Sequence, residues 1–256
     1  LKNVLNNSSK EHVFPDTFEH NGTQYTDHTE IAERFNSYFI NIGISLNESV
    51  NVLGLKPYTT YLKKVTNYSF KFESISENNI MDIINKLKCK SSTGFDNIST
   101  KLLKFIAPVI TSPLCMIINQ SLKTGIFPDK CKIAKVIPIY KKGKNVLFEN
   151  YRPISLLPAM SKVFERVVFD QIYKYFHVNK LLYVSQYGFR KDHSTEFAAT
   201  ELIDRVHNYL DKGETPFALF LDLSKAFDTL DHNILLHKLE NYGIHGIPLN
   251  WFESYL

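Results

Sequence analysis

The chain has 256 residues, of which 44% are hydrophobic and 22% are charged. This composition is typical of a globular protein and excludes an intrinsically disordered or collagen-like chain. The formal net charge of +4 is too small to identify a nucleic-acid partner without knowing where the charges lie. Cys89, Cys115 and Cys131 are widely spaced and form no CxxC pair, so we expect reduced thiols and no zinc site.

The sequence opens without a basic-then-apolar leader, and no apolar run approaches the ~18 residues needed to span a bilayer. We therefore expect an intracellular protein that is not secreted and has no membrane partner. The sequence starts at Leu1 and stops at Leu256 inside LNWFESYL, a pattern typical of the middle of a helix. We expect both ends to be cut from a longer protein.

Apolar residues at helical spacing predict several helices in the first half of the chain. The first runs from near Asp27 to Gly43. The second starts at the N-cap residue Ser76 and ends before the polar loop SSTGFDNIS. The helical pattern resumes over residues 101–105, and a further helix is expected from Pro108 to about Lys123, because proline suits the first turn of a helix.

A basic segment follows these helices. Seven lysines and one acid, Asp129, lie between Leu122 and Asn145. The lysines flank the strand pattern of residues 136–140, which ends in the turn signal KGK. A solvated lysine face is one explanation, and a basic hairpin that binds phosphate is the other. The lysines are Lys123, Lys130, Lys132, Lys135, Lys141, Lys142 and Lys144.

Arg152 begins a short extended piece that Pro153 and Pro158 bracket. Its guanidinium fork suits bidentate recognition of phosphate, although an ion pair with a surface acid would explain the residue equally well. A glycine turn farther along leads to a helix over about residues 194–210. The long amphipathic helix between them has an apolar face formed by Val163, Val167, Phe169 and Ile172.

The segment FALFLDLSKAFDTLDH carries a candidate metal ligand. Residues 217–221 are five consecutive apolar residues, as in a strand covered on both faces, and Asp222 follows them directly. A carboxylate in that position is rigidly held and can face a cleft, where it could bind a metal ion. The alternative is an aspartate that caps the next turn or helix. Asp228 fits the capping role better, because a helical pattern begins at Leu230 and ends at Gly243.

Five segments, taken in order, resemble the reverse transcriptase of non-LTR (LINE-type, jockey-like) retrotransposons. They are SSTGFDNIS, AKVIPIYKKGK, NYRPISLLPAMSKVFERV, QYGFRKDHST and FLDLSKAFDTLDHNILLHKLENYGI. The resemblance runs from about residue 76 to residue 256 and is strongest after Lys132. The helix that contains RFNSYFINIG resembles, less specifically, the segment that joins the endonuclease to the polymerase in jockey-like elements.

This resemblance implies the fold and the domain layout. The fold is α+β, the fingers and partial palm of a right-hand polymerase, mostly helical with a small mixed β-sheet. Residues 76–256 are then the reverse transcriptase domain, incomplete and with its core motifs from about residue 122. Residues 1–75 are a helical N-terminal extension that links the domain to an upstream endonuclease.

The resemblance also implies roles for single residues. Asp222 matches the first catalytic aspartate, a ligand of two Mg²⁺ ions, and the backbone carbonyl of Leu223 helps to hold one ion. Phe227 matches the steric gate against ribonucleotides, although it could also be an ordinary core phenylalanine. Arg152 and Lys141 match residues that grip the incoming triphosphate. The expected contacts with the template and nucleic acid are Gln186, Gly188, Arg190, Lys135 and Lys142.

The implied partners are an RNA template, a DNA primer and deoxynucleoside triphosphates, and nuclear residence is implied by analogy. Phe95 and Asn97 stand where many relatives have Pro and Gly, but Asn97 can adopt the left-handed conformation of a glycine. Lys191-Asp192 likewise replaces a common Pro-Gly pair.

Two more catalytic carboxylates, from a Tyr-x-Asp-Asp turn, are expected beyond residue 256. The chain is therefore expected to be truncated before that box and inactive by itself. Two functions remain open. The chain is either the front part of an RNA-directed DNA polymerase, active in its full-length parent, or a non-catalytic, nucleic-acid-binding remnant of a degenerate element.

Overall fold

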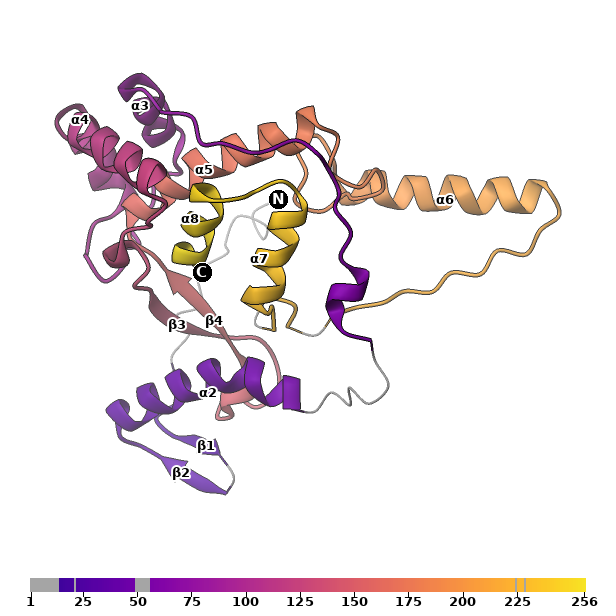
Figure 1. Cartoon of the computed structure of the whole chain (residues 1–256). Coiled ribbons are helices and arrows are strands. Elements are labelled where there is room, and N and C mark those ends of the chain that lie inside the picture. The colour runs from indigo at the N-terminus through magenta and orange to yellow at the C-terminus, as the bar shows by residue number, and fades with distance from the viewer. Residues whose placement is uncertain (1–13, 21, 49–55, 224, 228) are drawn as a thin grey trace, which may run out of the picture. The chain divides into compact units, whose positions relative to one another are not determined.

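A computed structural model describes residues 14–20, 22–48, 56–223, 225–227 and 229–256 (Figure 1). The fold is α+β and mainly helical, as the sequence predicts. Spatial clustering divides the chain into two compact units, which we describe one at a time. The first unit holds residues 14–48, 87–106 and 129–162, and the second holds residues 56–86, 107–128 and 163–256.

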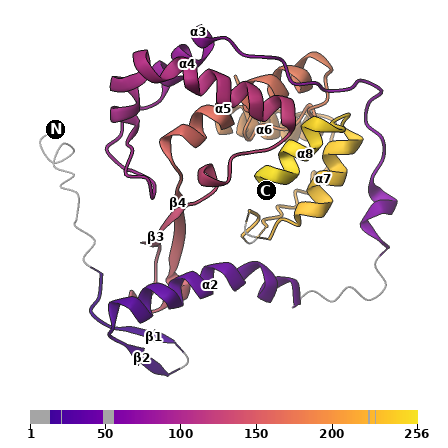
Figure 2. The same ribbon diagram turned by 60° about the vertical axis from the view of Figure 1, so that its left-hand side comes forward.

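The first unit begins with a small hairpin and a long helix. Strands β1 (Phe18–His20) and β2 (Thr23–Tyr25) are antiparallel, and α2 (His28–Glu48) follows them. Asp27 caps the helix, because its Oδ1 accepts hydrogen bonds from the backbone N–H of Thr29 and Glu30, both at 2.9 Å. The helix predicted from near Asp27 is thus confirmed. Both ribbon views show α2 lying along the β1–β2 hairpin (Figures 1 and 2).

An aromatic core joins this N-terminal part to a second hairpin in the same unit. Phe35 packs against Phe148 with 4.6 Å between ring centroids and against Tyr151 with 5.1 Å. Residues 14–48 therefore share one core with residues 148–151. That packing does not test the predicted domain boundary at residue 75, which stays a prediction. The buried residues of the core are Phe18, Ile31, Phe35, Phe148 and Tyr151.

The second hairpin pairs β3 (Lys135–Tyr140) with β4 (Tyr151–Leu156) in antiparallel register, which confirms the predicted strand over residues 136–140. The short helix η2 (Asp129–Cys131) precedes it, and η3 (Phe148–Asn150) lies in its connection. In the part of the chain that the structure describes, both sheets are antiparallel pairs. The expected mixed sheet is not found there, because the strand predicted at residues 217–221 does not form.

Helices make up most of the second unit. The cap predicted at Ser76 is confirmed, since Ser76 Oγ accepts from Asn79 N at 3.3 Å. The helix predicted from about residue 194 is capped by Ser194, whose Oγ accepts from Phe197 N at 3.3 Å. Helices α4 and α5 start in the first unit and continue into the second. The elements are η1 (Tyr58–Tyr61), α3 (Glu77–Lys86), α4 (Thr100–Thr124), α5 (Ala159–Val178), α6 (Thr195–Asp211), α7 (His232–Asn241) and α8 (Ile247–Tyr255).

Helix α7 confirms the predicted helix after residue 230. Its N-cap is Asp231, whose Oδ1 accepts from Ile234 N at 3.0 Å. Asp228, which the sequence favours as a cap, lies outside the described residues. Gly243 follows the helix end with a φ of +85°, a left-handed conformation that glycine adopts without strain.

Helix α4 differs from its prediction in two ways. The sequence predicts a new helix at Pro108, yet α4 continues through Pro108 and Pro113. Local preference is overridden because the helix buries Leu114, Ile118 and Leu122 along one face.

Helix α4 is also long and apolar enough to cross a membrane by length and composition, with a mean hydropathy of 1.7 over its 18-residue window. The expectation that no segment approaches that length and apolarity is therefore wrong. One third of that window is buried inside the protein, and a core helix meets the same criterion.

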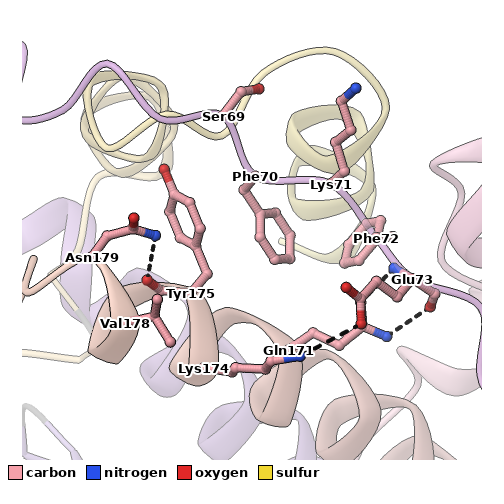
Figure 3. A pocket seen from close by; sticks show the side chains of 10 residues that line it. All are labelled: Ser69, Phe70, Lys71, Phe72, Glu73, Gln171, Lys174, Tyr175, Val178 and Asn179. Carbon is pink, nitrogen blue, oxygen red and sulfur yellow. Dashed lines mark hydrogen bonds and ion pairs between the residues drawn. The ribbon is translucent and has the colours of Figure 1, made fainter.

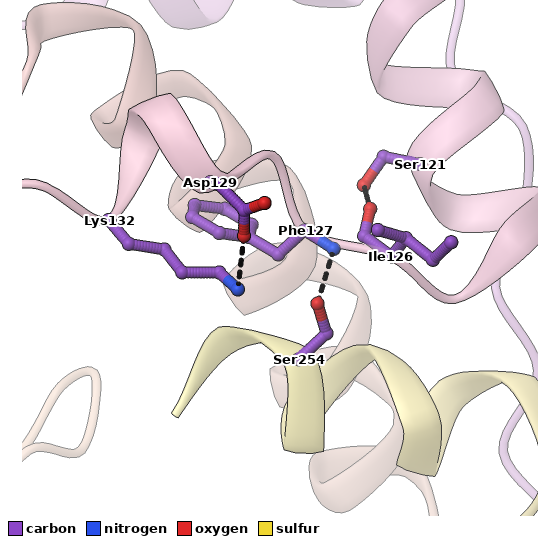
Figure 4. Close-up of polar contacts among 6 residues, drawn as sticks. All are labelled: Ser121, Ile126, Phe127, Asp129, Lys132 and Ser254. Atoms are coloured by element: carbon purple, nitrogen blue, oxygen red, sulfur yellow. Dashed lines mark hydrogen bonds and ion pairs between the residues drawn. The ribbon is translucent and has the colours of Figure 1, made fainter.

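The core of the second unit is built around Trp251 of α8. Its indole Nε1 donates to Ser121 Oγ at 3.0 Å, and its ring meets that of Phe127 edge-on at 5.3 Å. The backbone N–H of Phe127 donates to Ser254 Oγ at 3.0 Å (Figure 4). Nearby, the Tyr255 hydroxyl donates to Glu165 Oε1, and burial together with that carboxylate raises the pKa of Tyr255 to about 12.

Helix α5 buries Val163, Phe164, Val167 and Val168. Val163 and Val167 were predicted for this face, but Phe169 is 47% exposed, so its predicted place is wrong. Phe169 is two residues beyond Val167, which turns its side chain by about 200° around the helix.

Candidate active site and nucleic-acid interface

Residues 217–223, which end in the candidate catalytic carboxylate, form no strand. Phe217 is 88% exposed and Leu221 is 84% exposed, so the prediction of a buried strand is wrong here. A strand covered on both faces needs hydrogen-bonded neighbours at its edges and packed layers above and below. The described residues provide no strand that pairs with this segment. Asp222 is therefore exposed instead of held at the end of a sheet.

The segment that ends at residue 223 offers two oxygen donors for a metal ion. The Asp222 carboxylate and the Leu223 backbone carbonyl are hard donors of the kind that Mg²⁺ takes. Within the described ranges, which leave out residues 224 and 228, no three His, Cys, Asp or Glu side chains are grouped for a metal ion. Two donors do not complete an octahedral site. The residues present thus do not fit the ion without further ligands.

Phe227, the predicted steric gate, lies beside the predicted template segment. Its ring meets Phe189 edge-on, with 5.9 Å between centroids and an interplanar angle of 84°. Phe227 is 80% exposed, which argues against the alternative of an ordinary core phenylalanine in this structure. The contact brings Phe227 next to the loop that carries Gln186, Gly188 and Arg190. Sequence reasoning did not single out Phe189, whose one signal was its place between two predicted site residues.

The predicted template residues hold their own loop together. Arg190 Nη1 donates to the carbonyl oxygens of Tyr183 at 3.0 Å and Val184 at 3.3 Å. Gln186 Nε2 donates to the Gly188 carbonyl at 3.2 Å. A Cβ atom at Gly188 would meet nothing within 4 Å, so packing does not require glycine there. In this structure the Gln186 and Arg190 side chains shape the loop, and the contact of the three residues with nucleic acid stays a prediction.

Asn97 and Asp192, which stand where many relatives are expected to have glycine, both have a left-handed backbone conformation. Asn97 has a φ of +57°, which confirms the conformation predicted for it. Asp192, in the Lys-Asp pair that replaces Pro-Gly, has a φ of +60°. Asn and Asp tolerate this left-handed region better than most residues. Both residues therefore adopt a conformation that a glycine would also allow.

The β3–β4 hairpin carries the predicted phosphate ligand Arg152 on an exposed face. Ile139 lies opposite Arg152, and Lys135 lies opposite Leu156. Because side chains alternate along a strand, Lys135, Ile139 and Arg152 share one face of the hairpin. Lys135 and Arg152 are separated by about 14 Å along the strands, at ~3.4 Å per residue. The face thus has a cation at each end, and the exposed Ile154 lies between them.

The connection that carries Lys141 and Lys142 is fixed by side chains. Asn150 Nδ2 donates to the Lys144 carbonyl at 2.8 Å, and the Tyr151 hydroxyl donates to the Asn145 carbonyl at 2.6 Å. The backbone N–H of residue 141 also bonds to the Asn150 carbonyl at 2.8 Å. The two predicted lysines are therefore exposed side chains on a shaped loop.

In the first unit, some basic residues form ion pairs and others do not. Lys132 Nζ lies 2.9 Å from Asp129 Oδ1 (Figure 4). The hydrogen bond from Lys132, followed by its charge, lowers the pKa of Asp129. No described acid lies within ion-pair distance of Arg152, so the surface ion pair considered from the sequence is not found. Arg152 is available for an anionic ligand.

Comparison with protein families extends these observations. Residues 139–256, which contain β4, the loop at Gln186 and Asp222, match the family described as reverse transcriptase (RNA-dependent DNA polymerase). Residues 139–256 belong to the reverse transcriptase family. The family recognised from the five ordered motifs is confirmed.

Curated relatives are named RNA-directed DNA polymerases. The chain is 32% identical to the probable RNA-directed DNA polymerase from transposon BS of Drosophila melanogaster over 173 residues, which are 67% of this chain. Over 70% of the chain, it is 29% identical to the RNA-directed DNA polymerase from mobile element jockey of the same species. The aligned parts cover 19% and 20% of those relatives. The chain thus spans about a fifth of the length of the reverse transcriptase relatives it matches.

Proposed function

We propose that this chain forms the fingers and the beginning of the palm of an RNA-directed DNA polymerase from a non-LTR retrotransposon. The membership of residues 139–256 in the reverse transcriptase family carries this proposal. Its partners are an RNA template, a DNA primer and deoxynucleoside triphosphates, and it acts in the nucleus. The exposed cationic face of the β3–β4 hairpin supports the proposal, because phosphates dominate the affinity of proteins for nucleic acid.

In this proposal Arg152 and Lys141 hold the triphosphate, while Lys135 and Lys142 contact the nucleic-acid backbone. Guanidinium forks bind phosphate oxygens in pairs, and lysines supply the surrounding positive field. Gln186, Gly188 and Arg190 lie near the template, and the ring of Phe227 excludes ribonucleotides. The contact between Phe189 and Phe227 supports this grouping, since it joins the loop to the gate.

Asp222 and the Leu223 carbonyl contribute ligands for two Mg²⁺ ions in a longer protein that supplies further carboxylates. Mg²⁺ held there would supply the charge that activates the 3′-hydroxyl of a primer and stabilises the leaving pyrophosphate. The exposure of residues 217–223 supports this role of Asp222 in a longer protein, because an exposed apolar run is a surface on which additional strands can pack.

The first experiment replaces Asp222 with Asn in a longer protein that contains this chain. We expect primer extension on an RNA template to be abolished, because the amide cannot replace a charged metal ligand. Asp211→Asn, at the exposed end of α6, is the matched control and should retain activity. Normal extension by Asp222→Asn would refute the assigned role.

The second experiment uses the 256-residue chain alone with Mg²⁺. We expect no extension of a primer annealed to RNA, because one carboxylate does not hold two ions. Measurable extension that Asp222→Asn removes would contradict that expectation.

The third experiment tests the gate in the longer protein. Phe227→Val should raise the ratio of ribonucleotide to deoxynucleotide incorporation, because a smaller side chain leaves room for a 2′-hydroxyl. Phe189→Val is the control for the loss of the ring contact alone. An unchanged ratio in Phe227→Val would refute the steric role.

A second candidate function is non-catalytic binding of nucleic acid by a remnant of a degenerate element. The exposed face of the β3–β4 hairpin favours this function, since its cations and apolar side chains can bind RNA without catalysing a reaction. Binding of single-stranded RNA should weaken as salt is raised, and Lys135→Gln/Lys142→Gln should reduce the salt dependence. Retained binding, combined with no extension by any longer protein that contains a Tyr-x-Asp-Asp turn, would favour the remnant.

A further inference from the structure

A basic and aromatic segment lies outside the residues that match the reverse transcriptase family. Residues 56–72 contain four lysines and no acid, and tyrosine or phenylalanine stands between the lysines. The segment belongs to the second unit and includes η1, after which it has no regular secondary structure. Alternating cations and aromatic rings are typical of surfaces that bind single-stranded nucleic acid. The lysines are Lys56, Lys63, Lys64 and Lys71.

Backbone hydrogen bonds to other parts of the same unit fix the segment. Val65 N donates to the Asn241 carbonyl at 3.0 Å, and Phe70 N donates to the Gly243 carbonyl at 2.8 Å. The Tyr175 hydroxyl donates to the carbonyl of residue 68 at 3.2 Å. The chain path is therefore set by α5 and by the end of α7, although the segment is neither helix nor strand.

The continuation of the segment is paired to α5 by a side-chain amide. Gln171 Oε1 accepts from Glu73 N at 2.8 Å, and Gln171 Nε2 donates to the Glu73 carbonyl at 2.9 Å (Figure 3). This two-way bond replaces the backbone pairing that a neighbouring strand would give. A binding surface built on this segment is thus shaped before a ligand arrives.

The aromatic residues of the segment fall into two groups. Phe70 is 4% exposed, and Tyr58 stacks on His237 with 5.8 Å between ring centroids. Tyr61 and Tyr68 are 67% and 62% exposed. The first group anchors the segment, while the second presents two rings to solvent. The exposed rings are seven residues apart, at most about 25 Å along the chain.

A cavity of about 540 Å³ opens between the segment and α5 (Figure 3). Phe70, Phe72 and Tyr175 line it with aromatic carbon, and Lys71 and Asn179 are among its polar groups. The one acid in the lining, Glu73, already faces Lys174 at 3.8 Å. This volume lies within the range of pockets that hold small ligands. Of the two lysines in the lining, Lys174 faces Glu73, and the Lys71 side chain points away from α5 (Figure 3).

We infer that residues 56–72 and this cavity form a second binding site for single-stranded nucleic acid. Phosphates lie against Lys63, Lys64 and Lys71, and bases stack on Tyr61 and Tyr68. One nucleotide enters the cavity. The inference rests on the proposed function for the class of ligand, but the surface is built by residues that the family match does not include.

Fluorescence anisotropy with labelled 12-nucleotide oligouridine and oligothymidine tests the aromatic contacts. Tyr61→Ala/Tyr68→Ala should weaken binding of the 256-residue chain at least about fivefold, because one stacked base contributes about 1 kcal/mol or more. Phe197→Ala/Tyr209→Ala, which removes two exposed rings from α6, is the matched control and should bind like the parent. Thermal unfolding followed by circular dichroism checks that both variants remain folded.

The salt dependence tests the lysines. Lys63→Gln/Lys64→Gln should reduce the slope of log affinity against log salt by about 1.4, at ~0.7 for each lost phosphate contact with a single strand. Lys101→Gln/Lys212→Gln changes the net charge equally at two other exposed positions and should leave the slope unchanged. Equal changes in the two variants would overturn the inference, because net charge alone would then explain binding.

A third comparison separates this inference from the proposed function. If Lys135→Gln/Lys142→Gln weakens binding and Tyr61→Ala/Tyr68→Ala does not, the second site is refuted and the hairpin stands. If the tyrosine variant alone weakens binding, the second site stands and the hairpin contact fails. A glutamate-rich peptide of equal charge that competes as well as the oligonucleotide would overturn the inference, because the surface would then recognise charge without bases.

Discussion

Residues 62–75 and residues 217–223 are both irregular segments of the second unit, and both carry phenylalanine, yet they differ in burial. Phe70 is 4% exposed in the first segment, whereas Phe220 is 79% exposed in the second. Backbone groups of the first segment bond to Asn241, Gly243 and Gln171. The second segment has no such partners among the described residues. An irregular segment thus packs into the protein when other elements form hydrogen bonds with its backbone groups. Apolar side chains alone do not bury such a segment.

The largest expected loss of stability comes from removing a buried ring in the first segment, and the same change in the second segment tests the difference in burial. Phe70→Ala should lower the free energy of unfolding by about 3–5 kcal/mol, because it empties a packed site. Phe220→Ala should change it by less than about 0.5 kcal/mol, because its ring already contacts water. Urea denaturation of both variants provides the measurement. Equal losses would mean that residues 217–223 are packed after all.

The next effect concerns the close approach at the end of α7. A Cβ atom at Gly243 would collide with the Tyr68 carbonyl, and its φ of +85° also disfavours alanine. Gly243→Ala should therefore cost more than about 2 kcal/mol of unfolding free energy. Gly213→Ala, where φ is +74° and nothing lies within 4 Å, should cost only about 1 kcal/mol. Equal costs in chemical denaturation would show that the approach does not anchor residues 62–75.

A smaller loss of unfolding free energy is expected when the hydroxyl of Tyr175, which contacts residues 62–75, is removed. The Tyr175 hydroxyl donates to the carbonyls of Tyr68 at 3.2 Å and Tyr242 at 2.9 Å. Tyr175→Phe should cost about 1–2 kcal/mol, because both acceptors lose their donor. Tyr173→Phe, in the same helix, is a control that loses one bond to Lys191 N. An unchanged midpoint of urea unfolding for Tyr175→Phe would contradict the anchoring role.

Alkaline pH tests the same phenol. Burial raises the pKa of Tyr175 in the folded protein. The folded state then holds this proton more tightly than an unfolded chain, whose tyrosines have a pKa near 10. Its contribution to stability is complete below about pH 10 and is lost as pH rises through the folded-state pKa. Between about pH 9 and pH 11, Tyr175→Phe should lose less stability than the parent. Parallel losses would rule out this linkage.

The smallest effect lies beside the exposed segment. A double-mutant cycle of Phe189→Ala and Phe227→Ala should give a coupling of about 0.5 kcal/mol, because exposed edge-to-face rings interact weakly. Chemical denaturation of the four proteins gives that coupling. A coupling of zero would mean that the loop and the predicted gate are independent, and it would sharpen the contrast with the anchored segment.

Local chemistry explains which parts of the fold were predictable. Asp27, Ser76 and Ser194 cap helices through bonds to residues two or three positions ahead, so a short stretch of sequence suffices to predict where these helices begin. The β3 strand was predictable because a turn signal bounds its apolar pattern. The continuity of α4 through Pro108 was not, because burial decides it. Residues 217–221 match the pattern of a covered strand, but no pattern indicates whether the covering elements are present.

The candidate site was predictable only in part. Arg152 and Asp222 were assigned through a resemblance that rests on ordered motifs, and the family match includes both positions. The contact between Phe189 and Phe227 joins residues 38 positions apart in a loop and an irregular segment. No periodicity or spacing marks such a contact in a sequence. The anchoring of residues 62–75 escaped prediction for the same reason.

The hydrogen bonds from residues 62–75 to side-chain amides also have a consequence for the order of folding. Glu73 pairs with Gln171 across 98 positions of sequence, and Ile75 pairs with Asn119 across 44. Contacts this distant in sequence form slowly, because long loops must close first. We therefore expect the segment to dock only after α4 and α5 have assembled. Hydrogen exchange should show the amides of Glu73 and Ile75 gaining protection later than those inside the helices.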